Sequence, residues 1–183
     1  MGRLVLQGDR VVVVAPSEED EKEFLSKVRS STSLHERWVT PPSTRAGFAA
    51  YLERVRGPGH AGFLLRSEGE LVGVVNINNI VMGSLRSGYL GYYAFKGGEG
   101  RGLMSEGVTL VISFAFAELG LHRLEANIQP SNLASIRLAQ RVGLVKEGLS
   151  ERYLLVGGDW RDHERWATTV ERHGAARDPS EIA

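Results

Sequence analysis

The sequence predicts one mixed α/β domain built on a mostly antiparallel sheet. Its 183 residues fit a single ordinary domain, and a hydrophobic content of 42% is enough for a core. Between residues 87 and 128 a predicted strand, a helix and a second strand form a crossover, which makes those two strands parallel neighbours. The other predicted strands follow one another through short turns, as antiparallel strands do.

The first third of the chain predicts one strand and two helices. "RVVVVA" (residues 10–15) is typical of a buried strand, and Ser17 is placed to cap the helix that follows. That helix has an apolar stripe for the core: Phe24, Leu25 and Val28. A loop through Trp38 then leads to a second helix from about Ser43, closed by "RGPG".

The middle of the chain alternates strands and helices around a glycine cluster. "HAGFLLRSEGELVGVVNIN" predicts two strands around the turn "SEGE", and "SGYLGYYAF" predicts a third. "GGEGRGLMSEG" (residues 97–107) then opens a helix that ends at Gly120. "HRLEANIQP" predicts a strand, and Ser131 or Asn132 caps a further helix that ends at Gly143.

The last predicted element is a hairpin around Gly157 and Gly158, in "ERYLLVGGDWRDHERWATTV". We therefore expect a single domain over residues 1–173 and a flexible C-terminal tail over residues 174–183.

The composition excludes several classes of function. Lys plus Arg equals Asp plus Glu at 22 each, so no overall field would hold nucleic acid or an anionic membrane. The absence of cysteine excludes disulfides, thiolate zinc sites and a cysteine nucleophile, and the histidines lack the H-E-x-x-H spacing, so no metal is expected. No apolar run approaches the ~20 residues of a membrane span, and no signal peptide is recognisable, which predicts a cytoplasmic protein.

The glycine cluster does not fit the two common phosphate-binding motifs. A P-loop requires Lys and a hydroxyl residue where Leu103 and Met104 stand, and a dinucleotide fingerprint requires glycine at Leu103 or Ser105. What remains is a glycine turn before a helix N-terminus, where free amides and the helix dipole favour an anion. A plain connecting turn accounts for the glycines equally well.

Neighbouring motifs decide between these readings. "YLGYYAF", "EGRGLMSEG" and "IQPSNLASIRLAQRVGLVKEG" together resemble the GNAT acetyltransferases, whose diphosphate turn has a Q/R-x-x-G-x-G/A pattern. "GRGLMSE", "N-L-A-S" and "YLLVGGDWRDH" are similar to the RimJ/RimL branch, the ribosomal-protein alanine N-acetyltransferases. The resemblance covers residue 70 to the C-terminus. It implies the GNAT fold, with a central splayed parallel strand pair and flanking helices.

The resemblance also implies acetyl-CoA (or CoA) as cofactor and a set of residues that bind it. These are Leu90, Tyr92, Tyr93, Gly98, Gly100, Arg101, Gly102, Leu103, Met104, Asn127, Asn132 and Ser135. A bulge at Gly91 would splay the strand so that its backbone pairs with the pantetheine arm. For Tyr93 simple packing is the alternative, and for Asn132 a helix cap.

Two catalytic roles follow from the same comparison. The amide of Leu90 or Tyr92 would polarise the thioester carbonyl, and Ser135 would protonate the departing thiolate. Two family positions differ here, because Gly97 replaces a Gln or Arg of the turn and Leu154 replaces a glutamate taken as general base. The other candidate bases are expected to be mainly structural: Glu106, Glu147, Asp162 and His163.

The acceptor is implied to be a primary amine, most simply the α-amino group of a ribosomal or other protein. Trp38 and Asn76 are candidate substrate contacts, although Trp38 could also be a core lid and Asn76 could face solvent. A small amine such as a polyamine or an antibiotic, and a non-catalytic CoA-binding module, are the alternatives. Either a monomer or a homodimer is compatible with the sequence.

Overall fold

The computed structural model describes residues 4–175, which contain one sheet of eight strands in the order β1-β2-β3-β4-β5-β6-β8-β7. The strands are β1 (Val5–Gln7), β2 (Val12–Val14), β3 (Ala61–Ser67), β4 (Glu70–Val81), β5 (Ser87–Ala94), β6 (Arg123–Ile128), β7 (Val145–Val156) and β8 (Asp159–Thr169). Only β5 and β6 pair in parallel, so the predicted mixed sheet is confirmed.

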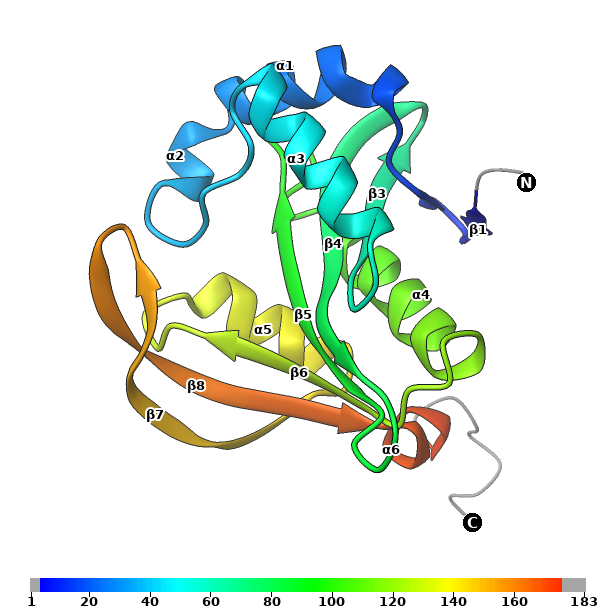
Figure 1. Cartoon of the computed structure of the whole chain (residues 1–183), viewed down its shortest axis with the longest axis vertical. Helices are drawn as coiled ribbons and strands as arrows, with labels where there is room; N and C mark the ends of the chain where they lie inside the picture. The colour runs from blue at the N-terminus through cyan, green and yellow to red at the C-terminus, as the bar shows by residue number, and fades with distance from the viewer. Residues whose placement is uncertain (1–3, 176–183) are drawn as a thin grey trace.

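The parallel pair is short and divides the sheet into two arms. Ser87 to Tyr89 lie opposite Arg123 to Glu125, and beyond Tyr89 no further pairs join β5 to β6. In Figure 1 β4 and β5 run up one side of the opening while β6, β8 and β7 turn away on the other. The register shift between β4 and β5 lies between Asn78 and Val81, so the bulge predicted at Gly91 is wrong.

Helices cover both faces of the sheet (Figure 1). They are α1 (Glu21–Ser30), preceded by a 3-10 turn (Glu18–Asp20), α2 (Thr32–His35), α3 (Arg45–Arg56), α4 (Leu103–Ala117), α5 (Leu133–Arg141) and α6 (Val170–Ala175). On one face α1 and α3 bury Phe24, Phe48 and Tyr51 with Phe95 of the β5 end. On the other, α4 forms the centre of the larger core.

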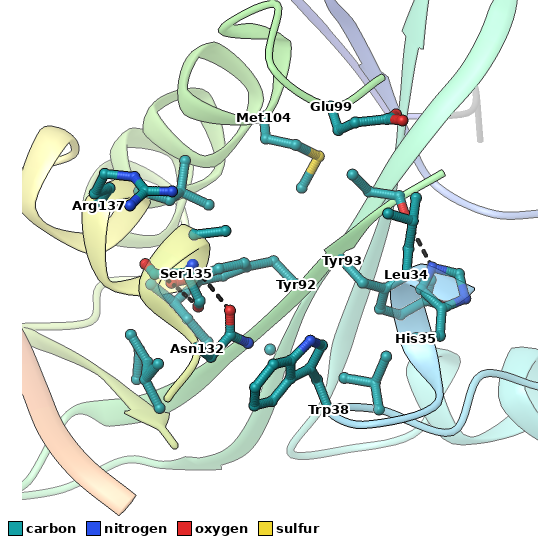
Figure 2. A pocket seen from close by; sticks show the side chains of 18 of the residues that line it. Leu34, His35, Trp38, Tyr92, Tyr93, Glu99, Met104, Asn132, Ser135 and Arg137 are labelled. Atoms are coloured by element: carbon teal, nitrogen blue, oxygen red, sulfur yellow. Dashed lines mark hydrogen bonds between the residues drawn. The ribbon is translucent and has the colours of Figure 1, made fainter. Parts of the chain in front are cut away.

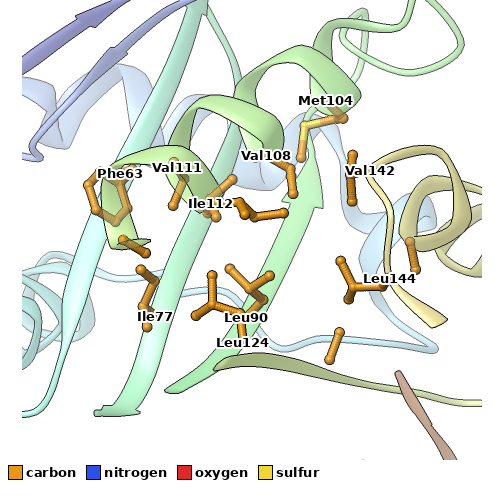
Figure 3. Close-up of a cluster of buried hydrophobic side chains, with 14 of the residues drawn as sticks. Phe63, Ile77, Leu90, Met104, Val108, Val111, Ile112, Leu124, Val142 and Leu144 are labelled. Carbon is orange, nitrogen blue, oxygen red and sulfur yellow. The ribbon is translucent and has the colours of Figure 1, made fainter. Parts of the chain in front are cut away.

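The stripe of α4 explains why this helix forms and which way it faces. Met104, Val108, Val111 and Ile112 recur at helical spacing and are buried against the sheet, as Figure 3 shows. Gly107 lets the helix approach the sheet closely, because a Cβ there would lie 2.4 Å from Leu65. The start of α4, which carries the glycine turn, is thereby fixed over the ends of the central strands.

The sequence reading missed three elements and displaced a fourth. Strand β1 lies in a stretch for which no element is predicted, and the short helix α2 lies in a predicted loop. Helix α3 begins at Arg45, where Thr44 rather than Ser43 precedes the first turn as its cap. Helix α6 extends over residues 174 and 175, the first two residues of the predicted tail. The remainder of that tail prediction lies outside the described residues.

Within residues 4–175 no helix is long and apolar enough to cross a membrane.

The first turn of α4 is tied by one carboxylate to the backbone that joins β1 to β2. Glu106 accepts the backbone N–H of Arg10 at 2.7 Å and of Val11 at 2.9 Å, and pairs with the Arg10 guanidinium at 3.3 Å. Arg10 also donates to the Arg101 carbonyl at 3.1 Å. Burial alone would raise the pKa of Glu106, but these bonds and the Arg10 charge lower it overall. Glu106 is thus a structural anchor for the glycine turn.

Replacing this anchor is expected to destabilise the fold. Glu106→Gln should lower the free energy of unfolding by about 1–3 kcal/mol at pH 7, because the NH2 group that replaces Oε2 cannot accept from the Arg10 guanidinium. The folded pKa is lowered, so the carboxylate stabilises fully above its unfolded pKa of about 4.3, and this stability is lost as the pH falls through the folded pKa. Urea unfolding at several pH values measures both effects.

The matched control is Glu70→Gln, which removes a carboxylate that is 70% exposed and paired with Lys27. Because exposed ion pairs contribute little, this variant should lose less than about 1 kcal/mol. Equal losses in the two variants, or a Glu106→Gln deficit that persists unchanged in acid, would contradict the anchoring role.

Candidate active site

A cavity of about 580 Å³ opens where β5 and β6 diverge. Its wall comes from α2, β5, the glycine turn, the start of α4, the end of β6 and α5 (Figure 2). Most of the predicted site residues lie in this wall: Trp38, Leu90, Tyr92, Tyr93, Gly98, Gly100, Gly102, Met104, Asn127, Asn132 and Ser135. Residues far apart in the sequence are therefore brought together in one place.

Three predicted residues lie outside the wall. Leu103 is buried in the core below α4, and Arg101 directs its guanidinium back to the Gly97 carbonyl at 3.4 Å. Asn76 is 8% exposed and accepts a hydrogen bond from Tyr51 at 2.9 Å, so it faces the α3 side of the sheet. The side chains of these three residues therefore do not contact the cavity.

The strand edge along the cavity is open. The Phe95 N–H donates to Val72 of β4 at 2.9 Å, so strand alternation turns the backbone groups of Ala94, Tyr92 and Leu90 away from β4, toward the opening. His35 donates from Nε2 to the Ala94 carbonyl at 2.8 Å. In the parallel ladder the pair of Tyr89 with Glu125 uses the Leu90 N–H, so the Leu90 carbonyl and the backbone groups of Tyr92 stay available to pair with a peptide-like ligand.

The glycines of the turn have different physical roles. Gly97, Gly100 and Gly102 have φ of 91°, 73° and 80°, values that favour glycine. Gly98 is required for space, because a Cβ there would lie 2.3 Å from the Val72 carbonyl oxygen. The turn thus combines left-handed positions with one close backbone contact.

The turn ends at the N-terminus of α4, which has free donors. The Glu106 N–H bonds the Gly102 carbonyl at 3.2 Å, so the amides of Leu103, Met104 and Ser105 have no partner within the helix. The space beside Gly100 is open, with no heavy atom within 4 Å of the position of a Cβ. Free amides, a helix dipole and open space together suit a phosphate.

Two hydroxyl groups meet at the divergence of the strands. Ser135 Oγ donates to the Tyr92 hydroxyl at 3.1 Å, and Tyr92 donates to the Ser135 carbonyl at 3.3 Å. Burial raises the pKa of Tyr92 to about 12, against a small lowering by the Ser135 bond. Asn132 accepts the Ser135 N–H at 3.1 Å, and this cap fixes the first turn of α5 (Figure 2). Both hydroxyls therefore remain protonated at neutral pH and are available as proton donors.

The residues fit the cofactor that the sequence implied. Asn127 lies in the wall, and its Oδ1 is buried without a hydrogen-bond partner. A buried acceptor of this kind is costly unless a ligand donor or water satisfies it. The open β5 edge, this acceptor and the α4 amides lie along one cavity, as an elongated ligand with amide and phosphate groups requires.

Several wall residues were not predicted. Ser33, Leu34, His35 and Val39 come with α2, which was read as loop, and Arg137 and Arg141 stand one turn apart on α5. The (i, i+4) spacing of two arginines after "N-L-A-S" was the available signal for the second group. Trp38, predicted as a substrate contact, lies in the same segment and was the available signal for the first group.

The candidate general bases lie in different parts of the structure, and most of them are away from the cavity. Glu106 is the anchor already described, Glu147 pairs with Arg123, and Asp162 accepts the Arg152 N–H at 2.8 Å. Leu154, at the position of the missing family glutamate, is 39% exposed on the hairpin. His163 alone of these residues lies in the cavity wall.

Comparison with known proteins agrees with this geometry. The model of the acetyltransferase (GNAT) domain family matches residues 10–145. Probable N-acetyltransferase YjcK of Bacillus subtilis is 36% identical over 129 residues, which cover 69% of this chain and 71% of that protein. The [ribosomal protein uS5]-alanine N-acetyltransferase of Escherichia coli is 42% identical over 103 residues, 56% of this chain and 53% of the enzyme.

Among solved structures, Mycobacterium smegmatis RimJ in complex with CoA-disulfide superimposes with a TM-score of 0.82 at 27% identity, covering 88% of this chain and 82% of that one. The family match spans most of the chain, including the glycine turn, both diverging strands and α5. This chain therefore belongs to the GNAT family of N-acetyltransferases.

Proposed function

We propose that this protein transfers the acetyl group of acetyl-CoA to the α-amino group of a protein N-terminus by direct attack. The observation that carries the proposal is the single cavity that joins the open β5 edge to the glycine turn and to the Ser135–Tyr92 pair. The similarity to the Escherichia coli uS5-alanine acetyltransferase supports a ribosomal protein as acceptor.

Different residues along the cavity would bind different parts of acetyl-CoA. The amides at the start of α4 and the turn glycines would hold the diphosphate, and Arg137 and Arg141 add positive charge on α5. The Leu90 carbonyl and the backbone of Tyr92 would pair with the pantetheine arm, and the Tyr92 amide would polarise the thioester carbonyl. Asn127 Oδ1 would accept a donor of the ligand. The bound acetyl-CoA supplies the activated acetyl group.

Proton delivery falls to the hydroxyl pair. A thiolate with a pKa of about 8.5 needs only a modest donor. Ser135, in the first turn of α5, donates its hydroxyl hydrogen to the Tyr92 hydroxyl. The pKa of Tyr92, about 12, keeps the Tyr92 hydroxyl protonated at neutral pH. The pair can therefore give a proton to the leaving sulfur and recover it from solvent.

The chemistry of the wall favours an α-amine over a polycation. Glu99, on the glycine turn, is the one carboxylate in the described wall, whereas a polyamine site would need several. An α-amino group, with a pKa near ~8, is already partly neutral at neutral pH, unlike lysine near ~10.4.

Intact-mass analysis tests the proposed acceptor. Purified ribosomal proteins are incubated with the protein and acetyl-CoA, beside a panel of polyamines and aminoglycosides. The proposal expects a single acetyl addition that maps to an N-terminal residue. Modification of small amines alone would replace this acceptor with a small molecule. Tight CoA binding without thiol release for any acceptor would leave a non-catalytic CoA-binding module.

Ser135→Ala is expected to lower turnover about 10- to 100-fold, because it removes one donor from the pair while Tyr92 remains. Acetyl-CoA affinity should change less than about threefold, since the amides that hold the phosphates are untouched. Free-thiol release measures the first quantity and calorimetric titration the second.

Ser84→Ala is the matched control, because Ser84 is exposed in the turn between β4 and β5. It should behave as the parent protein in both assays. If Ser135→Ala also turns over like the parent, the assignment of Ser135 as proton donor is wrong.

A further inference from the structure

The hairpin of β7 and β8 brings one histidine into the cavity wall, on the arm opposite to β5. We infer that His163 accepts the proton of the attacking amine, an inference that rests on the acetyl transfer proposed above. His163 is 3% exposed and lies in the same wall as Leu90, Tyr92 and Ser135. The sequence alone placed it on a hairpin with a structural role.

The tautomer of His163 is set by its backbone neighbour. Its Nδ1 lies 2.9 Å from the Arg161 carbonyl oxygen, which can only accept, so Nδ1 carries the hydrogen. In the neutral ring Nε2 then holds the lone pair. Within residues 4–175 no hydrogen bond engages Nε2 of His163. The ring nitrogens that are wholly buried without a partner belong to other residues, His35 and His60. His163 therefore presents a free proton acceptor.

A bulge in β7 holds this histidine in place. Ser150 lies opposite His163 and Leu154 opposite Arg161, so β7 has extra residues where β8 runs directly. Arg152 in the bulge has a φ of 47°, and its N–H bonds Asp162 Oδ1 at 2.8 Å. Positive φ in a non-glycine residue costs free energy, and bulges commonly re-aim side chains beside active sites.

The same bulge carries the ring that supports the histidine. Tyr153 meets His163 edge to face, with ring centroids 6.4 Å apart at 62°. The Arg161 carbonyl and the Tyr153 ring thus fix the plane of the imidazole from two sides. A side chain so held suits proton transfer, which requires a positioned acceptor.

The other proton acceptors of the described wall are worse placed. Glu99 is exposed on the glycine turn, where it accepts the Gly97 N–H at 2.7 Å, at the phosphate end of the cavity. His35 donates through Nε2 to Ala94, and its Nδ1 is sealed between aromatic rings, with Tyr93 at 5.1 Å. Figure 2 shows both on the side away from Ser135.

The step balances with groups already present. The amine nitrogen forms its bond to the acetyl carbon while its proton passes to His163 Nε2, directly or through one water. The carbon–sulfur bond breaks, and the Ser135–Tyr92 pair protonates the sulfur. His163 then releases its proton to solvent, and the hydroxyl pair regains one. The products are an amide and the CoA thiol.

His163→Gln tests this role, because glutamine is of similar size but cannot take a proton. We expect kcat/KM for the amine to fall about 100-fold or more, with acetyl-CoA affinity within about threefold of the parent. His163→Ala should lose activity similarly and regain part of it when imidazole is added, since imidazole can enter the space left. Thermal unfolding checks that both variants fold.

His122→Gln is the matched control: His122 is 50% exposed, bonds Glu171 and lies outside the wall, so activity should be unchanged. A His163→Gln variant as active as the parent overturns the inference and leaves the transfer intact. Loss of activity with loss of acetyl-CoA affinity, or with no imidazole rescue, also overturns it. If the parent protein acetylates only small amines, the proposal of a protein N-terminus as acceptor is wrong. The parent and the His163 variants are then compared with that small amine as acceptor, and this comparison decides the role of His163.

Discussion

The divergence of β5 from β6 after Tyr89 is the constraint on which the rest of the site depends. A sheet that stays paired has no free backbone groups, whereas this one leaves the Leu90 carbonyl and the backbone groups of Tyr92 facing a cavity. Unpaired backbone groups cost free energy when water is excluded. A ligand that pairs with them removes this cost, which favours its binding. Helix α5 packs beside β6, whereas α1 and α3 pack on the arm that contains β5.

The glycine turn depends on that divergence for its position. It follows directly from β5, and Glu106 fixes its far end to the backbone of Arg10 and Val11, nearly a hundred residues earlier. The loop therefore has open glycine positions between two fixed ends, Gly98 against Val72 and Glu106 against the backbone that precedes β2. Free amides can then point at a ligand without the loop collapsing onto the sheet. On the other arm, the β7 bulge fixes the position of His163, just as Glu106 fixes the position of the glycine turn.

The sequence predicted most of the fold because its periodicities are strong. The stripe of α4, the glycine turn and the crossover from β5 to β6 all follow from local patterns, and the resemblance identified Asn132 and Ser135 in the correct helix. Local patterns could not place α2, whose four residues lack a stripe and are held by the contact of His35 with Ala94. Nor could they place His163, because its position depends on a register shift between two strands. Asn76 was misplaced since strand alternation does not reveal which face is covered by α3.

Amide hydrogen exchange with and without CoA tests the central claim most directly, because it reads the backbone groups themselves. We expect the amide of Tyr92 and those of Leu103, Met104 and Ser105 to become protected together when CoA binds, while Gly91 and Tyr93, which face β4, change little. CoA binding that leaves the exchange of Tyr92 unchanged would contradict this, since the open strand edge would then have no part in holding the cofactor.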